Sequence, residues 1–180
     1  MNSSVYRCDR ANEPREPKEH RLFHYTRKPE HLEDMIRNGL WPRYCEEDFA
    51  WLVGYSVTLA FPMICFCDIP LDAAEAHRIR YGDYALGFSK HWVKKLDINP
   101  LWYVHQESNI GKRLAASLAM KPRFDLAKLD GNPMRDLLPF IKPVSGSQPD
   151  RSANRDGAFE ALAFEDEMEW RHTPSALATQ

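Results

Sequence analysis

The chain has 180 residues, of which 43% are hydrophobic and 28% charged, proportions typical of a soluble globular protein with one core. A formal net charge of −2 argues against a dominant phosphate-binding surface, although it leaves room for a local basic groove. The longest apolar stretch, 59–67, is too short to span a membrane, and no apolar signal core follows Met1. We therefore expect a cytoplasmic protein without a membrane partner.

The first predicted elements are a strand over 21–26 and a helix over 29–39. A proline in the first helical turn and a glycine at the end are typical of helix boundaries. The strand ends in His24, Tyr25 and Thr26, which are three groups able to hydrogen-bond a ligand at the edge of a core. The helix carries an apolar stripe at helical spacing, formed by Leu32, Met35, Ile36 and Leu40.

Predicted strands and helices alternate early in the chain, while irregular pieces separate the later strands. Segment 41–49 is aromatic and charged without a period and predicts a loop or short helix over the core. Segment 145–157 is rich in Ser, Gly, Asn and Asp and predicts a mobile loop. Strand signals recur at 59–68, 84–88, 101–104, 140–144 and 158–164. Helix signals recur at 71–80, 89–96 and 108–120.

These elements predict an α+β fold in which a mixed sheet is flanked by helices. Residues 1–20 are polar, charged and proline-containing, which predicts a flexible leader. The expected organisation is this leader, one α+β domain over 21–174 and a disordered tail over 175–180.

Several enzyme signatures are missing from the sequence: a glycine-rich phosphate loop, a G-x-S-x-G elbow and an H-E-x-x-H helix. The four cysteines have neither C-x-x-C spacing nor the pattern of a disulfide scaffold. Cys65 and Cys67 lie in an apolar strand and are interpreted as buried thiols. No metal site is predicted.

The acidic cluster before Trp170 is a candidate for chemistry. Glu167 and Glu169 are two residues apart, so on a strand both carboxylates would point to one face and push their pKa values apart. Arg171 is expected on the other face, paired with an acid elsewhere. The alternative is a solvated edge strand whose acids protect it from pairing.

Other candidates also have two interpretations. His24, in an apolar strand, is either a ligand-binding group or a satisfied core residue. Tyr81 and Tyr84 either stack on a planar ligand or pack where a helix joins a strand. Lys142 is a lone candidate for a phosphate contact.

Five motifs, taken in order over residues 21–174, resemble the bacterial AbiGi family. They are Phe23-His24-Tyr25-Thr26, Phe66-Cys67-Asp68-Ile69-Pro70-Leu71, Tyr81 to Lys90, Asn99-Pro100 and Glu167-Met168-Glu169-Trp170-Arg171. That family is linked to abortive infection, a defence against phage, and is labelled as an antitoxin. The resemblance implies a cognate toxin or antitoxin protein as partner.

The layout is also similar, at fold level, to the ADP-ribosyltransferases, whose sheet is split and mostly antiparallel. Those enzymes place a His or Arg on the first strand, an aromatic or hydroxyl residue on a middle strand and a Glu near the end. The resemblance assigns His24 to the first position and Glu169, preceded by Glu167, to the last. The middle position stays open between Tyr81, Tyr84 and Ser89.

The second resemblance implies NAD as the substrate. His24 would bind a ribose hydroxyl, a tyrosine would stack on nicotinamide, and Glu169 would stabilise the oxocarbenium-like charge. No metal is required for this chemistry. The cofactor-binding residues that it implies are His24, Tyr25, Thr26, Tyr81, Tyr84 and Ser89.

Three functions follow as hypotheses. The first is transfer of ADP-ribose from NAD to a macromolecular acceptor, protein or nucleic acid, by a toxic effector. The second is a non-catalytic antitoxin or sensor module that binds a protein partner. The third, a His/Glu nuclease, has no basic stretch to support it. A single pocket with an aromatic wall, lined by His24 and Glu169, would favour the enzyme. Glu167 and Glu169 solvated and far from His24 would favour the module.

Overall fold

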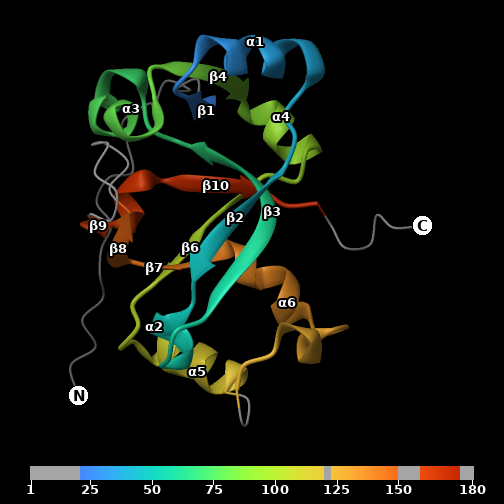
Figure 1. Ribbon diagram of the computed structural model, residues 1–180, viewed down its shortest axis with the longest axis vertical. Coiled ribbons are helices and arrows are strands. Elements are labelled where there is room, and N and C mark those ends of the chain that lie inside the picture. The colour runs from blue at the N-terminus through green and yellow to red at the C-terminus, as the bar shows by residue number, and fades with distance from the viewer. Residues whose placement is uncertain (1–20, 120–122, 150–158, 175–180) are drawn as a thin grey trace, which may run out of the picture.

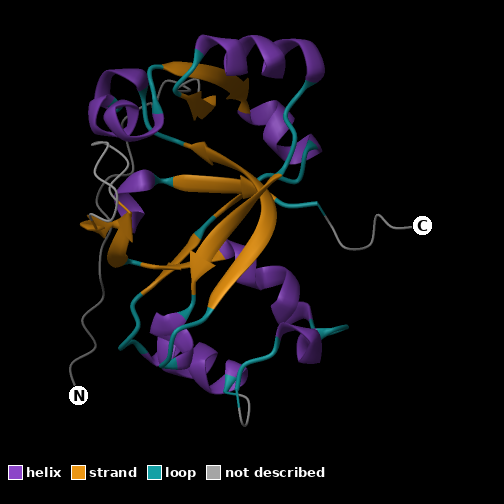
Figure 2. Cartoon of the chain, in the orientation of Figure 1, coloured by secondary structure: helices purple, strands orange, loops and turns teal. Residues whose placement is uncertain are grey.

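The computed structural model describes residues 21–119, 123–149 and 159–174. They form a mixed α+β fold in which a mostly antiparallel sheet crosses the middle and helices gather at its two ends (Figures 1 and 2). The fold class expected from the sequence is confirmed. The predicted leader, the predicted tail and most of the predicted mobile loop lie outside the described residues.

The main sheet has six strands, with the order β4-β1-β3-β10-β5 and β2 paired to β3 off this path. All of its pairings are antiparallel. Its strands are β1 (Arg21–Thr26), β2 (Arg43–Asp48), β3 (Thr58–Cys67), β4 (Tyr84–Ser89), β5 (Asn99–Pro100) and β10 (Glu169–His172).

The long strand β3 organises this sheet. Its first residues pair with β2, from Asp48↔Thr58 to Arg43↔Met63, and its last residues pair with β10. The first strand, β1, joins β3 through one register pair, Phe23↔Cys67, while it pairs with β4 along its whole length. Strands β1 and β4 therefore form a ribbon attached to the rest of the sheet by a narrow junction.

Two smaller strand pairs complete the described β-structure. Strand β6 (Trp102–Val104) runs parallel to β7 (Ile141–Pro143), and β8 (Ser145–Pro149) is antiparallel to β9 (Phe159–Ala163). The helices are α1 (Pro29–Asn38), α2 (Ala50–Val53), α3 (Glu75–Tyr81), α4 (Lys90–Lys95), α5 (Asn109–Leu118) and α6 (Pro133–Leu137). Short 3₁₀ turns occur at Leu71–Ala73, Leu126–Leu129, Leu138–Phe140 and Phe164–Glu167.

Local sequence signals explain several of these boundaries. Helix α1 begins with Pro29 and ends before Gly39, whose φ of 82° is costly for other residues. The N-cap of α5 is Ser108, whose Oγ accepts a hydrogen bond from the N–H of Gly111 at 3.0 Å. Helix α3 ends before Gly82, which has a φ of 115°.

Three expectations are corrected. Segment 41–49 contains a strand, β2, because pairing with β3 satisfies its backbone although its side chains show no apolar period. Residues 145–149 form β8, where a loop was expected. In the predicted apolar stripe of α1, Ile36 is exposed, and none of the residues of this helix is buried.

Two hydrophobic clusters lie on the two faces of β3. Alternating residues point to opposite faces of a strand, so Phe61 and Met63 join one cluster while Ile64 and Phe66 join the other. The first cluster comprises Phe49, Leu52, Phe61, Met63, Val104, Leu114, Leu118, Leu129, Leu138 and Ile141. The second comprises Leu22, Ile64, Phe66, Val93 and Ile98, with Leu40, Phe88 and Trp170 packed against it.

Candidate functional site

The two sequence-predicted acids are buried, with 6% of Glu167 and 9% of Glu169 exposed. Strand β10 lies between β3 and β5, so the alternative of a solvated edge strand is wrong. Glu167 ends a 3₁₀ turn rather than sharing the strand, and Met168 between the two acids adopts a left-handed conformation with φ of 43°. The turn brings both carboxylates to the same ammonium group.

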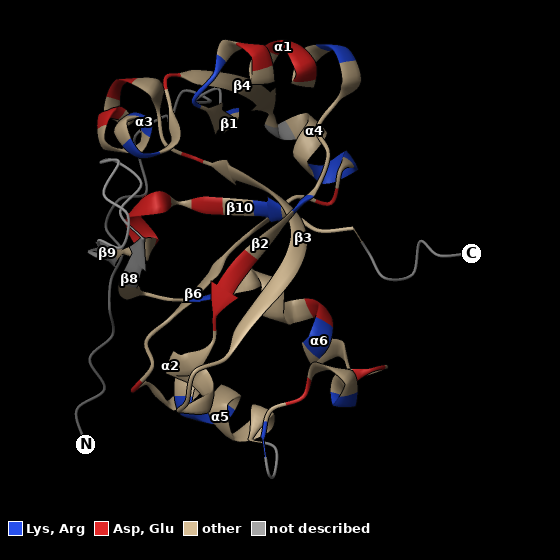
Figure 3. Ribbon diagram, viewed as in Figure 1, with Lys and Arg blue, Asp and Glu red and all other residues tan. Residues whose placement is uncertain are grey.

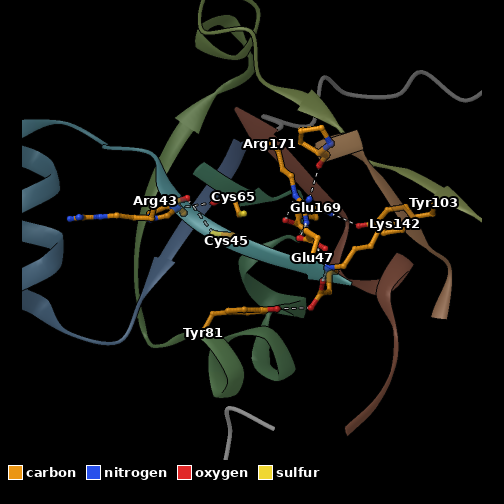
Figure 4. Close-up of polar contacts among 12 residues, drawn as sticks. Arg43, Cys45, Glu47, Cys65, Tyr81, Tyr103, Lys142, Glu169 and Arg171 are labelled. Atoms are coloured by element: carbon orange, nitrogen blue, oxygen red, sulfur yellow. Dashed lines mark hydrogen bonds and ion pairs between the residues drawn. The ribbon is translucent and has the colours of Figure 1, made fainter. Parts of the chain in front are cut away.

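Lys142 supplies that ammonium group from strand β7. Its Nζ donates to Glu167 Oε2 at 3.0 Å and to Glu169 Oε2 at 3.1 Å (Figure 4). Burial by itself lowers the pKa of Lys142, but the facing carboxylates outweigh it and hold the pKa above its ordinary value. Lys142 therefore remains charged, and its single positive charge offsets part of the negative charge of the two acids.

Arg171 is the second buried cation. Because Glu169 pairs with Cys67 and Arg171 with Cys65, both side chains point to the same face of the sheet, and the expectation of opposite faces is wrong. Arg171 Nε donates to Glu169 Oε1 at 2.7 Å, and Nη2 donates to Oε2 at 3.1 Å. Burial raises the pKa of Glu169, but the bidentate Arg171 and Lys142 outweigh it and hold the pKa below its usual range.

Arg171 also connects β10 to elements far away in the chain. Its Nη2 donates to the carboxylate of Glu47 on β2, and its Nη1 donates to the carbonyl oxygen of Pro139 at 2.6 Å. We call the five charged residues the buried ion cluster: Glu47, Lys142, Glu167, Glu169 and Arg171.

Two tyrosines border the buried ion cluster. The hydroxyl of Tyr81, at the end of α3, donates to Glu167 Oε1 at 2.6 Å, and Arg80 Nη1 lies 3.6 Å from the same oxygen. The hydroxyl of Tyr103 accepts a hydrogen bond from the backbone N–H of Glu169 at 2.9 Å. Burial raises the pKa of Tyr103 to about 12, so this phenol stays protonated.

His24 lies on the other face of the sheet from Glu169. Phe23, Cys67 and Glu169 are register partners and share one face. His24, one residue on, instead contacts the ring of Phe66 with centroids 5.9 Å apart. Its Nδ1 lies 2.7 Å from the carbonyl oxygen of Cys65, which can only accept, so Nδ1 carries the proton. Burial lowers the pKa of His24 and favours the neutral ring.

A row of aromatic rings leads from β1 to Glu167 and Glu169, which we call the acidic pair. Tyr25 lies 5.0 Å from His77, and His77 lies 4.4 Å from Tyr81, measured between ring centroids. The Tyr25 hydroxyl is a buried oxygen without a hydrogen-bond partner among the described residues. His77 was missed at the sequence level, although its spacing of four residues from Tyr81 on one helix could have revealed it.

The remaining predicted ligand-binding residues lie apart from the acidic pair. Thr26 Oγ1 is 3.3 Å from His31 Nδ1. Tyr84 is exposed on β4, the terminal strand of the sheet. Ser89 precedes α4 without a side-chain capping bond. Tyr81 is thus the candidate for the middle position that directly contacts an acid of the proposed set. The catalytic and NAD-binding roles stay predictions.

Comparison with known proteins gives one finding. The family described as "Putative abortive phage resistance protein AbiGi, antitoxin" matches residues 38–180, about four fifths of the chain. The chain therefore belongs to the AbiGi family, which is associated with resistance to phage by abortive infection. Neither the curated proteins nor the solved structures yield a match.

The family match covers the buried ion cluster and leaves out β1 with His24. None of the described helices is both long enough and apolar enough to cross a membrane.

Proposed function

We propose that this protein acts in abortive infection as an antitoxin, a non-catalytic module that binds and restrains a cognate toxin protein. The observation that carries the proposal is that both carboxylates of the acidic pair are already bonded to cations inside the protein. Glu169 is neutralised by Arg171 and Lys142, and Lys142 also bonds Glu167. A carboxylate held in this way would leave a buried cation unpaired if it moved, and it is poorly available to a reacting sugar.

The position of His24 supports the same proposal. A transferase of the type described above needs the histidine and the glutamate on one side of the bound dinucleotide. Here the two side chains point to opposite faces of the sheet, and the imidazole is bonded to the carbonyl oxygen of Cys65. Membership of the AbiGi family supports a role in defence against phage. The family is described as an antitoxin, which supports a toxin protein as the partner.

The test is genetic. Deleting this chain alone from its native defence locus should arrest growth, because the toxin is then unrestrained, and expression of the chain in trans should restore growth. Expression of the chain by itself should be harmless. A tolerated deletion together with growth arrest by the isolated chain would reverse the assignment and make this protein the toxic component.

A second candidate is transfer of ADP-ribose from NAD to a protein or nucleic acid. The narrow junction between β1 and β3 favours it, because His24 lies beside the point where the sheet divides. In this step the bond between ribose and nicotinamide breaks, nicotinamide leaves, and an acceptor oxygen or nitrogen forms the new bond and loses its proton. His24, Glu169 and Glu167 would be catalytic, and Glu169 would first have to leave its cations.

Nicotinamide release from NAD by the purified protein tests this candidate. The variants are His24→Ala and Glu169→Gln, and Glu165→Gln, which changes an exposed acid of the same turn, is the control. Release that is lost in both variants and kept in the control would establish cleavage of the nicotinamide–ribose bond by these residues, and labelled ADP-ribose on a protein or nucleic acid would establish its transfer. Release that persists in both variants contradicts the assigned roles. A folded wild type without release leaves the antitoxin as the function.

A further inference from the structure

Two exposed tryptophans lie among basic side chains at one corner of the molecule. Trp41, in the loop between α1 and β2, is 68% exposed, and Trp92 on α4 is 51% exposed. Neighbouring aromatic rings bordered by basic side chains form a candidate surface for a ligand that has both flat apolar parts and negative charge. We call these two rings and the exposed cations near them the Trp–Lys surface: Arg37, Trp41, Arg43, Trp92, Lys94 and Lys95.

The second hydrophobic cluster brings the two tryptophans to one region. Leu40 and Val93 both pack in that cluster, so the neighbouring Trp41 and Trp92 emerge from adjacent parts of the scaffold. The loop from α1 to β2 runs beside α4 (Figure 1). Lys and Arg residues mark α4, while Asp and Glu residues mark the middle of α1 and basic residues mark its ends (Figure 3). The positive charge is thus concentrated on the α4 side of this corner.

Contacts within the protein restrict the orientation of both rings. Trp41 Nε1 donates to the carbonyl oxygen of Asn38 at 3.2 Å, at the end of α1. Lys95 Nζ lies 5.1 Å above the ring of Trp92, a cation–π contact. A ring with a defined orientation loses little freedom when a base stacks on it.

One acid of α1 and one acid after α4 accept hydrogen bonds from nearby asparagines. Asp34 Oδ1 accepts a hydrogen bond from Asn38 at 2.6 Å, and Asp97 Oδ1 accepts one from Asn99 at 2.9 Å. Arg43 extends away from the buried ion cluster (Figure 4). The cations of the Trp–Lys surface are exposed to solvent, and Lys95 covers one face of the Trp92 ring, so a base would stack on the other face.

We propose that the Trp–Lys surface binds single-stranded nucleic acid. Bases stack on aromatic side chains in a sequence-tolerant manner, while lysines and arginines along the same path neutralise the phosphates. In a duplex the bases are stacked on one another, so the phosphates could bind the cations but no base could stack on the two tryptophan rings. This site is separate from the acidic pair and from the proposed restraint of a toxin.

The experiment measures binding of the full chain to labelled oligonucleotides of about 15 nucleotides, a length suited to sites of this kind. Oligo-dT, oligo-U and a mixed duplex are compared by fluorescence anisotropy, and quenching of tryptophan fluorescence reports stacking. If each of the four cations of the Trp–Lys surface contacts one phosphate, the logarithm of the association constant should fall linearly with the logarithm of the salt concentration. The expected slope for a single strand is about −3. Preference for oligo-dT or for oligo-U distinguishes DNA from RNA, and either preference supports the proposal.

The variants are Trp92→Ala and the pair Lys94→Glu with Lys95→Glu. Trp92→Ala should weaken binding about tenfold through the loss of stacking. The charge reversal should weaken it further and flatten the salt dependence. The matched controls are Trp102→Ala, whose ring is 48% exposed on β6, and Lys112→Glu on α5, which lies at the end of the molecule opposite α4 (Figure 1).

Three outcomes would overturn the proposal. The first is no anisotropy change at about 100 μM protein in low salt, where non-specific single-strand binding is strongest. The second is equal weakening by the control variants. The third is binding to the duplex as tight as to the single strands. Thermal unfolding of each variant, followed by circular dichroism, separates loss of binding from loss of fold.

Discussion

The buried ion cluster should depend strongly on Lys142. The substitution Lys142→Met keeps an unbranched stem but removes the charge that faces two carboxylates. Glu169 would retain Arg171, while Glu167 would retain the hydroxyl of Tyr81 and the more distant Arg80. Breaking a buried ion pair by removing one partner costs about 3–5 kcal/mol. This is a large share of the roughly 5–15 kcal/mol that stabilises a typical domain.

A double-mutant cycle isolates the charge interaction from other effects of the substitution. Lys142→Met combined with Glu167→Gln should cost less than the sum of the single changes, by about 1–3 kcal/mol, because a neutral amide needs no counter-ion. The free energy of unfolding is measured in urea at neutral pH. Lys112→Met, which removes an exposed partner of Glu107, is the matched control and should change the stability by no more than about 1 kcal/mol. Additive effects, or equal losses for Lys142→Met and the control, would refute this reasoning.

The same cluster predicts a response to acid. The folded-state pKa of Glu169 is held below its usual range, so its contribution is fully present above the unfolded-state value, about 4.3. The contribution is lost as the pH falls from there through the folded-state pKa. The free energy of unfolding of the wild type should therefore decline below about pH 4.3, and Glu169→Gln should show a shallower decline. Parallel pH profiles would contradict this role of Glu169.

Two further predictions concern other parts of the fold. A hydrogen bond with Cys65 lowers the pKa of the Cys45 thiol to about 7, so iodoacetamide should alkylate Cys45 with a half-maximal rate near that pH. In Cys65→Ala the midpoint should move up, and mass spectrometry of the modified peptide measures both. A Cβ on Gly82 would lie 2.3 Å from the carbonyl oxygen of Thr26, so Gly82→Ala should cost about 3 kcal/mol or more. Gly39→Ala, which has a similar backbone conformation but open space, should cost about 1–3 kcal/mol, less than Gly82→Ala in the same urea titration, and equal costs would contradict the clash.

The sequence by itself determined the elements whose signals are local. The strand β1, the helix α1 between Pro29 and Gly39, and the helix α5 after Ser108 agree with their predictions. Proline, glycine and capping residues act within a few positions of the backbone that they shape, so one segment contains the whole signal. The burial of β3 was also predicted, because a strand with a continuous run of apolar residues would be unstable in contact with water.

Only the tertiary structure decided how the charged residues combine. Lys142 and Glu169 are 27 residues apart, and Arg171 and Glu47 are 124 apart, so no spacing in the sequence predicts either pair. The same holds for β2, whose charged sequence becomes a strand because β3 offers it a partner. Strand register also placed His24 and Glu169 on opposite faces, since a shift of one residue reverses the direction of a side chain. Pairing and register arise between distant segments, and they determine which side chains meet.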